Sequence, residues 1–434
     1  MKDLECIPKI IKTNHMKKII VFLILLSIIG CNNNQTYTSH VSNVDMDSIE
    51  SLKRVDTSYT IIDVDNYKKM PYSELHKFLK NVKYIPLKSK EPIGVIDVIK
   101  IHKGRVFILD AFKSESIFIF DLVTGDLIKK IHDKGQGPAE YLGLIDMAIL
   151  NDQIIINDRL FYSTLYYTLD GEFIKKVRSI PNFYIEALNG TIVNQLTFSQ
   201  TSDFKINNTK CQLVFVSNDS IIRKAFPYYP IQENAVNGKT FWRNSKDELL
   251  FSPLLSDTVY QFMNDSSYFV KYVVKQKKSL WGRHSEYLNF NDHSRLVIQE
   301  GYTFLGYEFL EADDYVLYPI SIKYNEFRRT DIHLYNKKTG LSFRTILEGE
   351  EEDGQPFTTV IKKAQNVYGN YFVGVFEEYE IDGMKKFIKQ DKKNLFQVPE
   401  LKSILTSDIK DLECILVLYE FNDIEDIDMS GLTD

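Results

Sequence analysis

The sequence predicts an all-β protein whose blades of four antiparallel strands form a β-propeller. Three observations predict this fold: a sequence unit recurs with a period near 47 residues, glycine-containing turns separate its strands, and one strand is left over at each end of the repeats. The chain has 28 Phe and 26 Tyr but only 20 Gly and 12 Pro among 434 residues. This composition supports a large apolar core and excludes disorder for most of the chain.

The repeat is clearest in residues 105–131 and 153–177. Within these copies Asp110 aligns with Asp158, which lies 48 residues further on. The basic pairs of the first three copies are Lys129–Lys130, Lys175–Lys176 and Arg223–Lys224. Two later candidates are the hairpin 249–273 and the turn 332–340. A period of this length is typical of a propeller blade.

Each repeat reads as strands, because β-branched and aromatic runs are separated by Asp-Gly or Thr-Gly, where glycine supplies the positive φ of a tight hairpin. One small sheet cannot bury both of its faces, so the units must stack around an axis. A solenoid and a pair of β-sandwiches are the alternatives. The chain lacks the repeats of 20–30 residues typical of many solenoids.

The strands left over at the two ends are residues 82–87 and 415–421. Pairing them within one blade would close the ring and remove two exposed sheet edges. Only two helices are predicted, over residues 72–81 and 399–410, and the second begins with Pro399, a residue that suits the first helical position.

The N-terminal region predicts export. Met16 is followed by two lysines and an apolar run over residues 19–29, and Cys31 comes shortly after it. A run of about 11 residues is too short for a membrane-spanning helix, which needs roughly 20. Residues 27–31 resemble the lipobox of bacterial lipoproteins, which implies cleavage of 16–30, lipid on Cys31 and attachment to a membrane. An ordinary signal peptide with a chance cysteine, or a retained anchor, is the alternative.

The remaining boundaries follow from this interpretation. Residues 1–15 fit no export pattern and are treated as a non-native extension, 31–58 as a polar flexible tether, 59–421 as the propeller and 422–434 as an acidic tail. Surface-exposed lipoproteins of the Bacteroidetes carry acidic residues just after the cysteine, whereas this chain has none before Asp45. The expected location is therefore the cell envelope, on the outer membrane facing the periplasm.

Composition limits the partners and cofactors. The net charge is −6 for the whole chain and becomes −9 without residues 1–30, so nucleic acid is not expected as a partner. Cys211 and Cys414 lie in apolar surroundings about 200 residues apart, which favours buried free thiols over a disulfide. No metal-ligand spacing, phosphate-binding loop or Gly-x-Ser-x-Gly motif occurs, so we predict no metal and no cofactor.

The most specific string is the signature loop, residues 134–141, which contains Gly135, Gly137, Pro138, Glu140 and Tyr141. It resembles the Gly-x-Gly-Pro-Gly-Glu-Tyr signature of a Bacteroidetes six-bladed β-propeller family, and the resemblance extends over about residues 70–421. It implies six blades and leaves the biochemical role open.

Two interpretations of the signature loop remain. In the structural one, the glycines and the proline form a sharp turn between blades and Glu140 accepts backbone N–H bonds. In the functional one, Glu140 and Tyr141 lie at the propeller mouth and bind a ligand. Ala139 stands where the family has glycine, so a positive φ at this position would strain the loop.

The function predicted first is a non-catalytic binding or scaffold module, expected as a monomer, for a peptide, glycan or envelope protein. Trp242 and Trp281 are candidates for stacking on sugar rings, although packing in the core is the commoner role of tryptophan. The alternative is a hydrolase or lyase with residues from several blades at the axis. Converging Asp, Glu and His would favour the enzyme, whereas exposed Trp and Tyr with Asn and Gln would favour carbohydrate binding.

Overall fold

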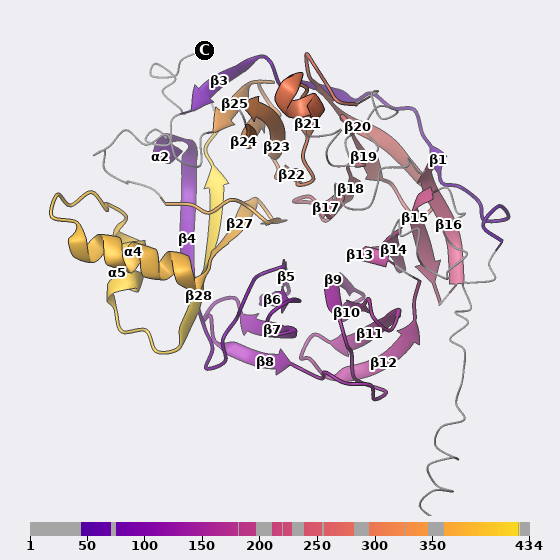
Figure 1. Ribbon diagram of the computed structural model, residues 1–434, viewed down its shortest axis with the longest axis horizontal. Helices are drawn as coiled ribbons and strands as arrows, with labels where there is room; N and C mark the ends of the chain where they lie inside the picture. Colours follow the sequence, from indigo (N-terminus) through magenta and orange to yellow (C-terminus); the bar gives the residue numbers. More distant parts are fainter. Residues whose placement is uncertain are drawn as a thin grey trace, which may run out of the picture.

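The fold is known from a computed structural model of the chain. It describes residues 45–70, 75–180, 182–196, 211–218, 220–227, 238–253, 256–281, 295–325, 327–345, 360–423 and 425. Six antiparallel blades surround a central axis, as predicted (Figure 1). Cys31, the lipobox, the expected signal peptide and most of the acidic tail lie outside the described residues. No helix in the described ranges is long and apolar enough to cross a membrane.

The first three blades follow one another along the chain, and each begins with its innermost strand. Blade 1 contains β5 (Val98–His102), β6 (Arg105–Asp110), β7 (Ser116–Asp121) and β8 (Leu127–Ile131). Blade 2 contains β9 (Leu144–Leu150), β10 (Gln153–Asp158), β11 (Ser163–Thr168) and β12 (Phe173–Arg178). Blade 3 contains β13 (Asn182–Leu188), β14 (Thr191–Leu196), β15 (Cys211–Ser217) and β16 (Ser220–Pro227). The basic pairs of the repeat lie on the outermost strands β8, β12 and β16.

The last three blades are less regular. Blade 4 contains β17 (Phe241–Arg243), β18 (Leu249–Phe251), β19 (Thr258–Phe262) and β20 (Ser267–Lys275). Blade 5 follows a π-helical turn, η3 (Arg295–Gln299), and contains β21 (Phe304–Leu305), β22 (Leu310–Glu311), β23 (Tyr315–Tyr324), β24 (Phe327–Asn336) and β25 (Ser342–Thr345). Blade 6 contains β26 (Asn366–Tyr368), β27 (Tyr371–Phe376), β28 (Leu412–Phe421) and β4 (Leu79–Lys88).

Blade 6 closes the ring as the sequence predicted. Strand β4 comes from the N-terminal side of the domain and pairs antiparallel with β28 from the C-terminal side. The ladder extends from Lys88 opposite Leu412 to Leu79 opposite Phe421. Neither strand is therefore left as an open edge, which stabilises the ring against opening.

The helices differ from the prediction. Among the described residues, helix α2 spans Leu75–Phe78 and ends before the predicted residue 81, because residues 79–81 belong to β4, where β28 supplies their backbone partners. Helix α5 (Pro399–Thr406) begins at the predicted proline but ends four residues before the predicted end. Helix α4 (Glu378–Gln390) was not predicted. Together α4 and α5 project outward from blade 6 (Figure 1).

Part of the expected tether is packed against the domain. Residues 45–70 run along the outside of blades 3, 4 and 5 and form β1 (Lys53–Arg54), β2 (Thr60–Asp63) and β3 (Tyr67–Met70). Strands β1 and β2 pair in parallel with β20, and β3 pairs in parallel with β25. We call this segment the N-terminal strap. The tether boundary at residue 58 is therefore corrected: the chain is already attached to the blades at Met46, which is buried against blade 3.

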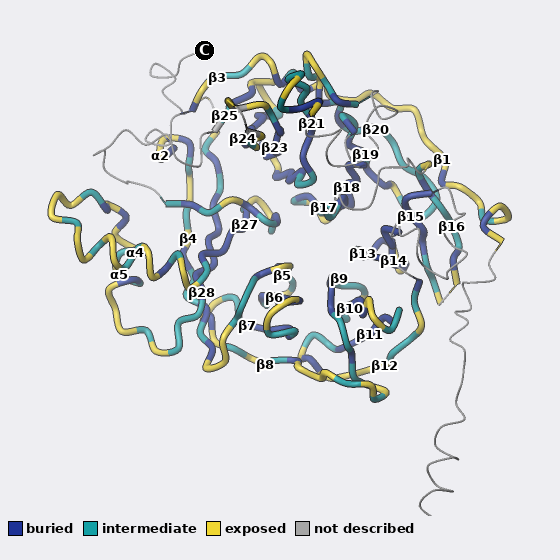
Figure 2. The backbone as a smooth tube through the Cα atoms, viewed as in Figure 1, coloured by how far each residue is buried: buried dark blue, intermediate teal, exposed yellow. Residues whose placement is uncertain are grey.

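The core lies within and between the blades, while exposed residues line the rim (Figure 2). The repeated aspartates Asp110 and Asp158 are fully buried and accept backbone N–H bonds from neighbouring turns. At the hairpin turn of blade 1, Gly125 has φ +70, and a Cβ there would collide with the carbonyl oxygen of Pro86. Glycine is thus required at this turn. Cys211 and Cys414 are buried free thiols, as predicted.

Candidate binding site at the propeller axis

Two cavities lie at opposite ends of the axis. The innermost strands of blades 1 to 4 and 6 run in the same direction between them, so we name the cavities after the ends of these strands. The strand-start cavity has a volume of about 510 Å³ and the strand-end cavity about 890 Å³. Lys100, Arg243 and Asn366 line both cavities, so these three side chains separate them.

Buried charged side chains lie between the two cavities. We call Lys100, Asp146, Glu186, Lys239 and Arg243 the axial cluster. Four of them lie on the innermost strands β5, β9, β13 and β17, and Lys239 lies two residues before β17. No side chain of the cluster is more than 20% exposed. The innermost strand of each of blades 1 to 4 therefore contributes one residue to the axial cluster, and these four blades meet at the axis.

Glu186 is the centre of the axial cluster. Its Oε2 lies 2.5 Å from Lys100 Nζ and 3.6 Å from Lys239 Nζ, and its Oε1 lies 3.4 Å from Arg243 Nε. Burial alone would raise the pKa of Glu186, but the charges of Lys100, Lys239 and Arg243 outweigh burial and hold this pKa well below its ordinary value. Glu186 is therefore a buried carboxylate anion.

Asp146 forms the second anionic position. Its two carboxylate oxygens lie 3.2 and 3.0 Å from Lys239 Nζ, and it accepts the backbone N–H of Ile185 at 2.8 Å. Burial raises the pKa of Asp146, and Lys239 and Lys100 offset only part of that effect. The pKa of Lys239 is raised, because Asp146 and Glu186 outweigh the opposing effect of burial.

Aromatic side chains form the wall of the strand-start cavity. Tyr184, Trp242 and Tyr307 are half-buried in it, and Phe112 is 68% exposed. Trp242 Nε1 donates a hydrogen bond of 2.5 Å to the carbonyl oxygen of Tyr307, which fixes the indole ring. Gln365 and Asn366 lie on the blade 6 side, and Asn366 Nδ2 already donates to the carbonyl oxygen of Ile99 at 2.8 Å. Flat apolar rings beside polar amides can hold a ligand that has both an apolar face and hydroxyl groups.

Comparison with protein families matches residues 59–419 to a family described as Domain of unknown function (DUF4934). The chain belongs to this family. The matched range is close to the predicted domain limits of 59–421. No curated protein matches the chain.

Two solved structures are similar to this family member. One is a Bacteroides fragilis NCTC 9343 protein described as exported, with a TM-score of 0.63 and 16% sequence identity over 84% of this chain and 100% of that chain. The other is a member of the DUF4221 family from Bacteroides vulgatus, with a TM-score of 0.47 and 10% identity over 80% and 98% of the two chains. At such identities the first likeness shows the fold alone.

The signature loop connects blade 1 to blade 2. The carboxylate of Glu140 accepts the backbone N–H of Gly137 at 2.7 Å, and a Cβ on Gly135 would collide with this carboxylate. Ala139 does not adopt a positive φ, so alanine at this position causes no strain. Pro138 is exposed on the loop. These contacts agree with the structural interpretation of the turn.

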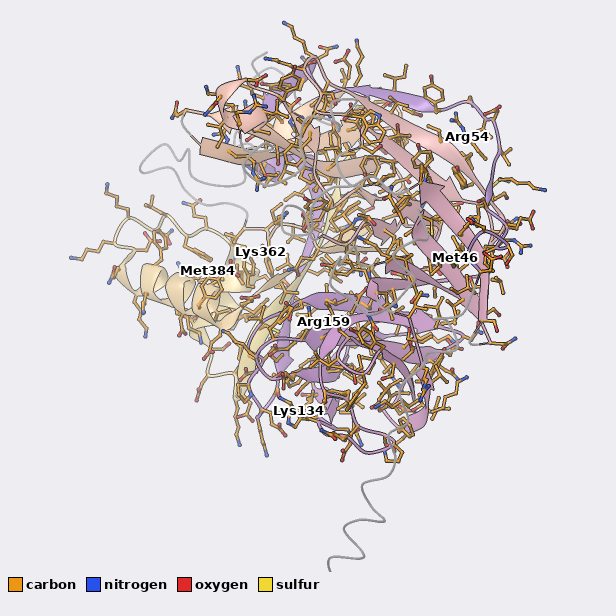
Figure 3. The ribbon with its side chains drawn as sticks, turned by 45° about the vertical axis from the view of Figure 1, so that its right-hand side comes forward. Met46, Arg54, Lys134, Arg159, Lys362 and Met384 are labelled. Atoms are coloured by element: carbon orange, nitrogen blue, oxygen red, sulfur yellow. The ribbon has the colours of Figure 1, made fainter. Side chains whose placement is uncertain are left out.

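Tyr141 does not lie at the propeller mouth. Its side chain is fully buried, and its hydroxyl donates to the carbonyl oxygen of Glu115 at 2.8 Å. Neither Glu140 nor Tyr141 lines either axial cavity. In Figure 3, Lys134 of the signature loop lies near the lower edge of the molecule, whereas Arg159 lies closer to its middle. The functional interpretation of Tyr141 is therefore corrected, because its hydroxyl bonds within the core.

The two tryptophans have different positions. Trp242 lines the strand-start cavity and also packs against the core clusters of blades 4 to 6. Trp281 lies beyond the last strand of blade 4 and lines neither axial cavity. Only Trp242 is thus placed where it could contact an axial ligand. Within the ranges that the structure describes, no group of three His, Cys, Asp or Glu side chains could hold a metal ion.

The axial cluster was not predicted from the sequence. Lys100, Asp146, Glu186 and Arg243 are separated by 40 to 57 residues, so no local motif contains two of them. The sequence feature that could have identified these residues is a single charged residue within an otherwise apolar innermost strand, as at Asp146 between Ile145 and Met147. The blade period does not align these charges, because Lys100 lies opposite Phe107 whereas Asp146 lies opposite Asn157, two residues away in the repeat.

Proposed function

We propose that this protein is an exported lipoprotein, anchored through lipid on Cys31, whose propeller binds a sugar chain in the strand-start cavity. The anchor rests on the lipobox-like sequence before Cys31. The ligand class rests on the cavity wall. Placement on the outer membrane facing the periplasm belongs to the same proposal.

The observation that carries the proposal is the grouping of Tyr184, Trp242 and Tyr307 with Gln365 and Asn366 around one cavity of about 510 Å³. Aromatic faces pack against the apolar side of a pyranose ring, and amides exchange hydrogen bonds with its hydroxyl groups. The exposed Phe112 extends this surface to the cavity rim. A cavity of about 510 Å³ lies within the range of roughly 300–1,000 Å³ that is usual for small-molecule sites.

The same geometry favours binding over hydrolysis. A glycoside hydrolase uses one carboxylic acid as proton donor and one carboxylate as base or nucleophile. Asp146 and Glu186, the most buried carboxylates of the axis, are occupied by Lys239 and Lys100. Carboxylates held in this way stabilise the site and are poorly placed to transfer protons to a ligand.

Tryptophan fluorescence tests the ligand class, because the chain has only two tryptophans. The Trp281→Phe variant leaves Trp242 as the single emitter, in the wall of the cavity. We expect a panel of oligosaccharides to change its emission in a saturable way, and the additional change Tyr307→Ala to weaken that response about tenfold. Saturable responses to peptides alone would contradict glycan binding.

Metabolic labelling with a fatty-acid analogue tests the anchor. Cys31→Ser should abolish the label, while Cys211→Ser should retain it, because Cys211 is a buried thiol of blade 3. Equal labelling of the Cys31→Ser variant and the parent chain would refute lipidation at this residue.

A further inference from the structure

We propose that the sugar chain bound in the strand-start cavity is acidic, and that its carboxylate binds Lys100 at the floor of the cavity with Arg159 at the rim. This inference rests on the proposed function and specifies its ligand as a uronic-acid type of glycan. Three features of the axis support it.

The first feature is the charge balance of the axial cluster. Its buried side chains are three cations, Lys100, Lys239 and Arg243, and two anions, Asp146 and Glu186, a formal charge of +1. Arg243 also pairs with the exposed carboxylate of Asp247 at 3.1 Å, outside the cluster. The whole chain, in contrast, has a net charge of −6. An unbalanced charge is unfavourable in a buried site, and a bound anion relieves it.

The second feature is the open hydrogen-bonding capacity of Lys100. An ammonium group has three donors. Within the described part of the chain, Lys100 Nζ makes one hydrogen bond, to Glu186 Oε2. Lys239 Nζ, in comparison, bonds both oxygens of Asp146 and the carbonyl oxygen of Ile185. Burial also lowers the pKa of Lys100, more than Glu186 raises it, so the protein alone compensates this ammonium charge incompletely.

The third feature is access. Lys100 lines both axial cavities, and its side chain is 14% exposed, so it is accessible from the axis. Arg159 lines the same cavity from the loop that follows β10, and none of the described residues forms an ion pair with its guanidinium. A guanidinium binds carboxylate in a bidentate way. One cation at the floor and one at the rim thus flank the aromatic wall.

The acidic groups of the cavity are already engaged. Asp97 accepts the backbone N–H of Ala111 at 2.7 Å, and Glu308 pairs with Lys363 at 2.5 Å. Asp146 is bound by Lys239. Lys100 and Arg159 are therefore charged groups of this cavity that have donors available to a ligand. Glu308 and Asp146 are paired with lysines, whereas Asp97 has a backbone hydrogen bond but forms no ion pair with the described residues.

The test compares a uronic-acid tetrasaccharide with the neutral tetrasaccharide of the same linkage, using the full chain with Trp281→Phe and the emission of Trp242. We expect the acidic sugar to bind about tenfold more tightly than the neutral one. Lys100→Met should remove this difference between the two sugars. Lys129→Met, on the outermost strand β8, is the matched control and should change neither affinity.

A second variant keeps the proposal testable if Lys100→Met does not fold. Arg159 is exposed, so Arg159→Gln should fold as the parent does and should weaken binding of the acidic sugar more than that of the neutral sugar. Equal affinities for the two sugars, or an acidic-sugar affinity insensitive to both variants, would overturn the carboxylate site while glycan binding stands. Binding of neither sugar would overturn both proposals.

Discussion

Two aspartates of this propeller, the buried Asp110 and the half-buried Asp257, differ in how their carboxylates are compensated. Asp110 accepts the backbone N–H groups of Gly94, Lys113 and Ser114, and these bonds lower its pKa although burial opposes them. Asp257 has weaker compensation. Burial raises the pKa of Asp257 to about 6, and the hydrogen bond from Gln276 offsets only part of that effect. The first aspartate therefore stabilises its turn as an anion, whereas the second is harder to ionise than an ordinary aspartate.

The stability of the protein should consequently depend on the ionisation of Asp257. The folded pKa of about 6 lies above the ordinary value of 3.8, so the folded chain binds more protons between these values and stability falls as pH rises through them. Asp257→Asn removes this effect. Relative to the parent, its free energy of unfolding should increase by about 2 kcal/mol between pH 4 and pH 7. Urea denaturation at several pH values measures the difference.

Two comparisons isolate the contribution of Asp257. Burial lowers the pKa of His333 to about 3, which weakens the fold as pH falls below 6.5, but this effect is common to both chains and cancels in the difference. Asp56→Asn, at a carboxylate that is 95% exposed, should show no such pH dependence. A constant difference between Asp257→Asn and the parent would contradict the raised pKa.

At the scale of elements, the N-terminal strap joins blades that the repeat alone leaves separate. Strand β2 adds to the outer edge of blade 4 and β3 to that of blade 5, and Ser51 bridges to Lys224 of blade 3. Added strands cover exposed sheet edges and bury apolar side chains from one strand face. The strap therefore stabilises three blades on the side where the tether joins.

The strap predicts that two neighbouring residues contribute very differently to the free energy of unfolding. Ile62 is fully buried against Val259, Tyr272 and other residues of blades 4 and 5, whereas Ile61 is 57% exposed. Ile62→Ala should lower the free energy of unfolding by about 2–4 kcal/mol, and Ile61→Ala by less than about 0.5 kcal/mol. Denaturant titration measures both. Similar values for the two variants would show that the strap is not held in this register.

The sequence predicted the elements best where the repeat is regular. The turn glycines Gly125 and Gly171 and the buried Asp110 and Asp158 recur in blades 1 and 2, because the same hairpin geometry requires them twice. The strap could not be predicted, since its strands are short and their partners lie about 200 or more residues away. Helix α4 had a local signal that was missed: Glu377 and Glu380 form a capping box.

The candidate site was harder to predict than the fold. Of the residues nominated from sequence, Trp242 lines the axial cavity, while Glu140 and Tyr141 serve the turn between blades 1 and 2. Motifs along the chain report local geometry, such as the tight loop at Gly135. The axial cluster depends instead on the ring, which brings together one residue from each of several blades.

For the whole molecule, closure of the ring depends on β28, the third strand of blade 6. It pairs with β27 on one side and with β4 on the other, and Ile415, Leu416 and Val417 are fully buried. Without β28, two sheet edges would face each other across a gap of about 10 Å, roughly two strand spacings. Blades 1 and 5 would then lose the neighbour that covers them, so the axis and its cavities depend on this one strand.

Truncation tests this dependence. A chain that ends at Asp423 keeps β28 and the bonds of Asn422 to Phe78 and Tyr315, and should unfold cooperatively at the same denaturant concentration as the parent. A chain that ends at Asp411 lacks β28 and should show no cooperative unfolding transition, because the loss of the buried strand removes more than the about 5–15 kcal/mol by which domains are stable. Circular dichroism during urea titration distinguishes these outcomes. A cooperative transition for the shorter chain would mean that five blades and the strap hold the ring without its closing strand.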